Sequence, residues 1–160
     1  MAKQTDAPDD FFAGGYFTCE IDGITQAAFQ SAEGLNVHRE VVEYQEGGEN
    51  ARTHKLVGQT RYSNIVLRTG VTESDDFFKW MKKTVDGTVE RKNGAIIFYD
   101  RAKTPRVRWD FTNGWPCRWE GPQLSSMEAE IKIELLEIAH DGFEMKLSGG
   151  GASAGAGGGP

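Results

Sequence analysis

The chain has 160 residues, 38% of them hydrophobic and 26% charged, a composition that suits one domain with a single core. Its net charge of −6 at pH 7 argues against nucleic-acid binding as the main function, because neutralising phosphates requires clustered lysine and arginine. No apolar run approaches the roughly 20 residues that a spanning helix needs, and the N-terminus lacks a signal-peptide pattern. We therefore expect no membrane span and synthesis in the cytoplasm, with Cys19 and Cys117 as free thiols rather than a disulfide.

The two ends of the chain differ in composition from the rest. Residues 1–14 are mostly polar and are expected to form a flexible leader. Residues 148–160 consist of Gly, Ala and Ser apart from the last residue, a composition that buries too little surface to offset the entropy of ordering. We expect a flexible tail there and one folded domain over residues 15–147.

Alternating apolar and polar residues predict strands through most of this domain. The first two, Tyr16–Asp22 and Ile24–Gln30, flank an Asp-Gly dipeptide typical of a tight hairpin turn. In the next, Leu35–Gln45, the alternation changes phase near Val41-Val42, which indicates a β-bulge. Four further strands are predicted at Tyr62–Gly70, Gly94–Asp100, Arg106–Thr112 and Met127–His140.

The segment Thr72–Gly87 has helical spacing instead. Ser74 is a candidate N-cap, acidic residues fill the first turn, lysines lie near the end, and Gly87 can terminate the helix. The residues expected to pack this helix on the sheet are Phe77, Phe78, Trp80, Met81 and Val85. The pattern predicts a mainly β fold, an antiparallel β-barrel or sandwich with one packed α-helix.

The stretch Glu43–Gly70 could be a phosphate-binding loop or an arm that extends from the sheet. A Walker-type loop needs a Gly-Lys-Ser/Thr sequence between a strand and a helix. Here Gly47-Gly48 is followed by no Gly-Lys pair, and Glu46 and Glu49 would repel a phosphate. The arm is therefore the better interpretation.

No residue pattern indicates catalysis or a metal site. His38, His54 and His140 have no metal-ligand spacing and are expected to be solvated or structural. A hydrolase with Cys117 as the nucleophile is conceivable, but no flanking motif supports it. We predict that the chain is not an enzyme and that it uses no cofactor and no metal.

Three of the four tryptophans lie close together, as Trp109, Trp115 and Trp119. They could form a stacking platform for a carbohydrate or peptide, in a small β-barrel binding module. Core packing and subunit contact is the simpler interpretation, because Trp109 already belongs to the apolar face of a predicted strand. Trp115 follows an expected turn at Asn113-Gly114.

Several short motifs follow one another in a distinctive order. They are Gly34-Leu35, Glu43-Tyr44 with Gly47-Gly48, Leu56–Gln59, Ile65–Gly70 and Phe78–Trp80. Their order and spacing, and the segment Trp109–Glu144, resemble the inner tube proteins of contractile tails, found in T4-like phages and in phage-tail-like contractile injection systems. Val57 stands where that family usually has proline, and the Gly-rich tail is not typical of it.

The resemblance implies a tail-tube fold in which six subunits join their sheets into a ring and the rings stack. An extended inter-ring loop would reach the neighbouring ring, which matches the polar segment Gln45–Gln59. Gly47-Gly48 would mark where the chain leaves the sheet, and Gly58-Gln59 where it returns. The residues assigned to the loop are Glu46, Gly47, Gly48, Glu49, Asn50, Arg52, His54, Lys55, Gly58 and Gln59.

The implied function is mechanical: sheath contraction would drive a hollow tube, carrying DNA or protein cargo, through a target envelope. The implied partners are further copies of the chain, the sheath protein, the baseplate or spike hub, the tube terminator and the cargo. The particle would be a phage virion or an extracellular or cytoplasmic injection particle. The solvent faces of Arg106–Thr112 and Met127–His140 are candidates for the lumen wall, and the acidic net charge suits a wall that does not grip DNA.

Overall fold

The computed structural model of the chain describes residues 15–22, 24–48, 51–69, 75–121 and 134–148. The expected leader 1–14, all of the expected tail 148–160 except Ser148, Gly23, Ser74 and residues 127–133 lie outside that part. The elements in chain order are β1 (Tyr16–Ile21), β2 (Ile24–Phe29), β3 (Ser31–Glu33), β4 (Val37–Tyr44), β5 (His54–Tyr62), β6 (Ile65–Thr69), α1 (Asp76–Val85), β7 (Lys92–Tyr99), β8 (Pro105–Glu120), β9 (Glu134–Ala139) and β10 (Gly142–Leu147).

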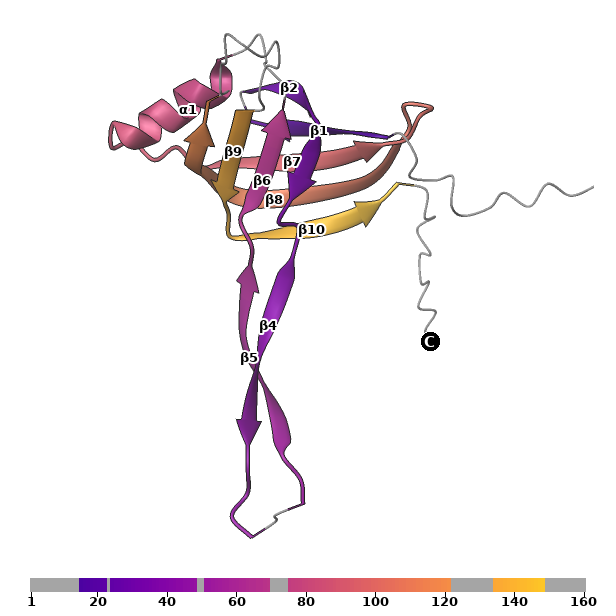
Figure 1. The fold of residues 1–160 in the computed structure, drawn as a ribbon, viewed down its shortest axis with the longest axis vertical. Helices are drawn as coiled ribbons and strands as arrows, with labels where there is room; N and C mark the ends of the chain where they lie inside the picture. Colours follow the sequence, from indigo (N-terminus) through magenta and orange to yellow (C-terminus); the bar gives the residue numbers. More distant parts are fainter. Residues whose placement is uncertain (1–14, 23, 49–50, 70–74, 122–133, 149–160) are drawn as a thin grey trace, which may run out of the picture.

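Antiparallel pairing builds one sheet in the order β2-β1-β7-β8-β9-β6-β3, and β10 also pairs with β8. The long strand β8 belongs to both halves of this sheet: its first part pairs with β7 and β10, and its last part with β9. Only Gln30 separates β2 from β3, and its backbone N–H donates to the carbonyl of Arg68 at 2.9 Å. The two ends of the sheet therefore meet, and it closes as a barrel, which confirms the predicted mainly β fold (Figure 1).

The expected turn at Asn113-Gly114 is wrong, because β8 continues through both residues. Across this point, Gly94 of β7 lies opposite Phe111 while Lys92 lies opposite Gly114, so β8 carries one extra residue. Asn113 adopts a φ of 52°, which accommodates the extra residue in β8. Its N–H donates to Oδ1 of Asn93 at 3.1 Å. An Asn-Gly pair thus bends a strand here instead of ending it.

The core lies inside the barrel and continues under α1. Its buried residues alternate along the strands, as period-two burial requires. They are Cys19, Ile21, Phe29, Ile65, Leu67, Phe77, Trp80, Ile96, Phe111, Leu136 and Ile138. Among the described residues, no helix has the length and apolar character that crossing a membrane requires.

The helix packs on the barrel through part of its predicted face. Phe77 and Trp80 are buried, and Phe78, although 44% exposed, places its ring edge-on against Trp119 with centroids 4.9 Å apart. Met81 is half-buried. The prediction for Val85 is wrong: it is 66% exposed, because the last turn of α1 extends past the sheet (Figure 1). The helix begins after Asp75 and stops before Gly87, whose φ of 95° ends it as predicted.

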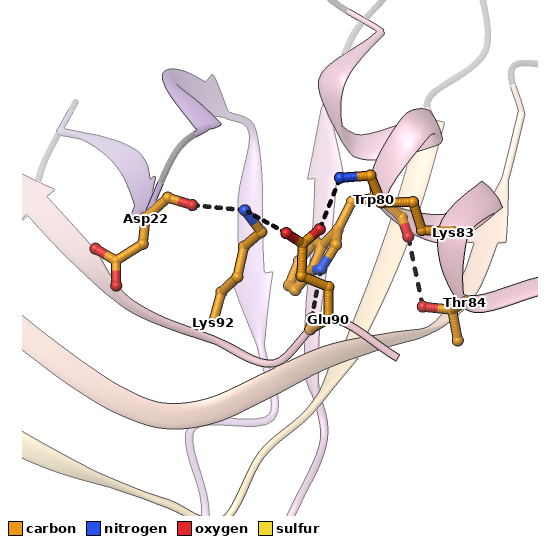
Figure 2. A network of polar contacts seen from close by, with 6 residues as sticks. All are labelled: Asp22, Trp80, Lys83, Thr84, Glu90 and Lys92. Atoms are coloured by element: carbon orange, nitrogen blue, oxygen red, sulfur yellow. Dashed lines mark hydrogen bonds and ion pairs between the residues drawn. The ribbon is translucent and has the colours of Figure 1, made fainter. Parts of the chain in front are cut away.

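A polar network centred on Glu90 ties α1 to the barrel (Figure 2). The Glu90 carbonyl accepts the indole N–H of Trp80 at 2.8 Å, and its carboxylate lies 2.9 Å from Nζ of Lys83. Lys92, at the start of β7, lies 3.9 Å from the same carboxylate and donates to the carbonyl of Asp22 at 2.9 Å. The segment between α1 and β7 therefore anchors the helix to the end of β1.

Candidate functional site

Strands β4 and β5 form a separate two-stranded antiparallel ribbon that projects far from the barrel (Figure 1). Pairing runs from Val37 opposite Tyr62, next to the barrel, to Tyr44 opposite His54, near the tip. We call residues 37–62 the arm. Every side chain of β4 is exposed, and so are all residues of β5 except the half-buried Gly58. An isolated two-stranded hairpin is marginally stable in water, so an arm of this kind gains most by packing against something else.

The arm differs from the expected inter-ring loop in two ways. The segment Gln45–Gln59 is not a loop throughout, since its second part belongs to β5. Gly47-Gly48 lies at the tip instead of at the exit from the sheet, and Gly58-Gln59 lies inside β5 instead of at the return. The physical reason is that cross-strand pairing extends to His54 and Lys55, which the sequence assigns to a loop. Glu49 and Asn50 lie outside the described residues.

Gly58 allows a β-bulge in the middle of the arm. Arg39 pairs with Thr60 and Val41 pairs with Val57, so Gly58 and Gln59 together face Glu40. A Cβ on Gly58 would lie 2.9 Å from the Glu40 carbonyl oxygen, too close for any other residue. The bulge predicted near Val41-Val42 is therefore present, but the extra residue is in β5.

Apolar side chains occupy both faces of the arm. Because directly paired residues point to the same side, the pairing assigns each residue to a face. One face carries Val37, Val41, Val57 and Tyr62, and the other carries Val42, Tyr44 and Leu56. All seven are exposed, Val57 by 71%. Among the predicted loop residues, Glu46, Arg52, His54, Lys55 and Gln59 are exposed as well.

The arm joins the barrel at a packed base. Tyr62 lies edge-on to Phe143, with ring centroids 5.4 Å apart, and 6.0 Å from His140. Nε2 of His140 lies 2.8 Å from the carbonyl oxygen of Ser63. Asn64 donates from Nδ2 to Oε1 of Glu137 at 2.8 Å. Residues from β9, β10 and the turn between them thus hold Tyr62 and the two residues that connect the arm to β6.

The outer face of β8 carries paired charges. Arg108 Nε lies 2.6 Å from Asp110, and Lys146 Nζ of β10 lies 2.9 Å from the same carboxylate. Arg108 also reaches Glu20 of β1 at 3.4 Å. Partial burial opposes ionisation of Asp110, but hydrogen bonds from Lys146 and Arg108 outweigh it and lower the pKa of that carboxyl. This part of the candidate lumen wall therefore presents largely self-neutralised charge.

The described residues support neither a hydrolase site at Cys117 nor a stacking platform of tryptophans. Burial raises the pKa of the Cys117 thiol, so the nucleophilic thiolate is disfavoured. Both cysteines are free, and no group of three or more potential metal ligands occurs within the described ranges. Trp109 and Trp119 pack against the core on different parts of β8, and the Trp119 indole N–H donates to Glu134. Trp109 and Trp119 therefore do not form an open platform.

Residues 14–144 match a family model described as T4-like virus tail tube protein gp19. The chain belongs to this tail tube family. It is a structural tube subunit and not an enzyme, as the sequence predicts. Comparison with curated protein sequences finds no match.

Solved structures of contractile systems share this tail tube fold. A chain of the sheath–tube complex of an extracellular contractile injection system, PVC, in the extended state is 25% identical with a TM-score of 0.72, covering 82% of this chain and 88% of that one. A chain of the anti-feeding prophage tube terminating cap is 25% identical with a TM-score of 0.72, covering 92% and 95%. Hcp1 from Salmonella typhimurium, at 14% identity, a TM-score of 0.58 and coverage of 83% and 86%, shares the fold.

Sequence reasoning about this tail tube subunit missed β10 and the base of the arm. A signal for β10 was present, because Asp141-Gly142 is a typical hairpin dipeptide and apolar residues alternate after it. For the base no local signal existed: His140 and Ser63 lie 77 positions apart.

Proposed function

We propose that this subunit forms rings that stack into the inner tube of a contractile particle, and that the arm makes the contact between rings. The observation that carries the proposal is the arm itself: a two-stranded ribbon with exposed apolar side chains on both faces. Exposed apolar surface of this kind marks an interaction site. Two apolar faces require two covering surfaces, which two different neighbouring subunits would supply.

The barrel offers a separate surface for ring formation. Strand β10 pairs with β8 on one side, and within the described part of the chain no strand pairs with its other side. Met145 and Leu147 on β10 are 58% and 64% exposed. Unpaired edges with apolar side chains promote association with other chains. A head-to-tail contact that places this edge against a different surface of the next copy generates a closed ring when the rotation from copy to copy closes on itself.

The proposed partners follow from the assemblies in which similar chains occur. Similar chains belong to a PVC sheath–tube complex, to a PVC sheath/tube terminator and to the six-fold symmetrised AFP baseplate. By analogy, we infer a six-membered ring, a surrounding sheath, a baseplate or spike hub at one end and a terminator at the other. The particle would be a phage tail or an extracellular injection particle, with DNA or protein cargo in its lumen.

A shortened arm tests the proposal. Replacing Val41–Gly58 with Asn-Gly would leave Glu40 opposite Gln59 and close the inner arm with a two-residue hairpin turn. We expect rings but no stacked tubes by negative-stain microscopy, and a thermal unfolding midpoint within a few degrees of that of the natural chain. Normal tubes from the shortened protein would refute the role of the arm. Monomers without rings would refute it too, because the arm would then be needed within a ring and not only between rings.

A further inference from the structure

Side chains of the barrel hold the base of the arm in place. The arm leaves the barrel as two adjacent segments, one around Asn36 and the other around Ser63-Asn64. The Ser63 N–H donates to the carbonyl of Asn36 at 3.2 Å, which keeps the two segments side by side. A hinge at this point would let the arm swing, so contacts from the barrel to either segment decide its direction.

The first such contact is made by His140, at the end of β9. A backbone carbonyl can only accept a hydrogen bond, so Nε2 of His140 must carry the proton that it donates to the Ser63 oxygen at 2.8 Å. The other ring nitrogen, Nδ1, is buried and has no hydrogen-bond partner among the described residues. The rings of Phe111 and Phe143 pack near the imidazole, with centroids 6.2 and 6.0 Å from its own. The hydrogen-bonding capacity that His140 uses is therefore directed at the arm.

The second contact is made by Tyr62, which belongs to the innermost pair of the arm, opposite Val37. Its ring lies edge-on to Phe143 and against Gly142, where a Cβ would be only 3.2 Å from the ring. Glycine at this position lets the ring approach the backbone of β10. The base is thus held at two adjacent residues: His140 holds the backbone of Ser63, and Tyr62 is held through its own ring.

We propose that His140 and Tyr62 are positioning residues that set the direction in which the arm leaves the barrel before another ring is met. The inference rests on the proposed stacking role of the arm. A fixed arm loses less conformational freedom when it docks than a swinging one, so the same contacts yield tighter association. Neither residue needs to touch the neighbouring ring to have this effect.

The direct test is the spread of distances between the arm and the barrel in unassembled protein. Spin labels are placed on Arg52→Cys in the arm and Arg101→Cys between β7 and β8, in a Cys117→Ser background. His140→Leu puts an apolar side chain of similar size in place of the imidazole and so removes the donor, whereas His140→Gln keeps a donor of similar reach. We expect pulsed electron paramagnetic resonance to give a narrow distribution for the parent and for His140→Gln, and a clearly broader one for His140→Leu.

Two further variants complete the test. His38→Leu makes the same chemical change in the second pair of the arm, at an exposed side chain on the face opposite to Tyr62, and is expected to leave the distribution narrow. Tyr62→Ala removes the ring contact and is expected to broaden it even if His140→Leu fails to fold. A narrow distribution in a folded His140→Leu or Tyr62→Ala protein overturns the proposal.

The protein concentration needed for tube formation tests the positioning role separately from the proposed stacking role of the arm. Loss of one hydrogen bond at the base is expected to raise the protein concentration needed for tube formation about tenfold, with rescue by His140→Gln. A broadened distance distribution together with a higher concentration for tube formation supports both proposals. Broadened distances with an unchanged threshold support the positioning role and refute the stacking role of the arm.

Discussion

The indole of Trp80 and the carbonyl of Glu90 form a 2.8 Å hydrogen bond that joins α1 to the segment leading into β7. Trp80 is only 2% exposed, so the bond also satisfies a buried donor.

Trp80→Phe should therefore destabilise the subunit by about 2 kcal/mol, because it leaves a void and an unpaired carbonyl. Urea unfolding followed by circular dichroism measures the change. Val85→Ala, at an exposed position of the same helix, is the control and should change the free energy of unfolding by less than about 0.5 kcal/mol. Equal effects of the two variants would contradict this account of α1.

Gly34→Ala should be among the most damaging single substitutions. A Cβ on Gly34 would lie 1.9 Å from the carbonyl oxygen of Asn64, and its φ of 85° disfavours any side chain. We expect a loss of at least about 3 kcal/mol, seen as a lower thermal midpoint or as insoluble protein. Gly47→Ala is the matched control, because a Cβ at the arm tip meets nothing within 4 Å, and its stability should be unchanged.

Asp100 should make stability depend on pH in the acid range. A hydrogen bond from the Thr104 N–H and an ion pair with Arg106 lower the pKa of its carboxyl from the ordinary value of about 3.9. A carboxyl with a lowered folded-state pKa stabilises the fold above the ordinary value and loses that contribution as the pH falls through the lowered one. Asp100→Asn should thus be less stable than the parent at neutral pH, and the difference in denaturation midpoint should shrink as the pH falls below the ordinary carboxyl pKa of about 3.9.

Charges on the arm should block stacking without unfolding the barrel. Val57→Asp and Leu56→Asp place a carboxylate on opposite faces of the ribbon, at residues already exposed. Each should raise the concentration needed for tube formation by about tenfold or more, since a charge would be buried in the contact. Sedimentation measures tube formation. If only one of the two variants has an effect, the arm is covered on a single face.

The β10 edge should control ring formation separately. Met145→Lys together with Leu147→Lys adds charge to exposed positions on this edge. We expect monomers with a barrel as stable as that of the parent, because lysine on an edge strand prevents strand addition. Intact rings from this variant, seen by light scattering or microscopy, would exclude β10 from the ring contact.

Local patterns predicted the elements that owe their form to neighbouring residues. The pair β1–β2 and helix α1 follow from alternation, a hairpin dipeptide and helical spacing within short windows. The full length of β8 was hidden because Asn113-Gly114 forms a bulge where a turn is the commoner outcome. The ribbon form of the arm was hidden for another reason: its charged residues become strand only by pairing across the tip. Contacts such as that between His140 and Ser63 form only once the barrel has closed. The sequence around each of these two residues therefore gives no local sign of the contact.

Strand β8 gives the subunit a mechanical property that its fold class alone does not. Because one continuous backbone of 16 residues runs through both halves of the barrel, they are joined covalently as well as by side-chain packing. A shearing load applied to the half that contains β7 passes to the half that contains β9 along peptide bonds. Each subunit of a tube can therefore carry such a load without its two halves separating from one another.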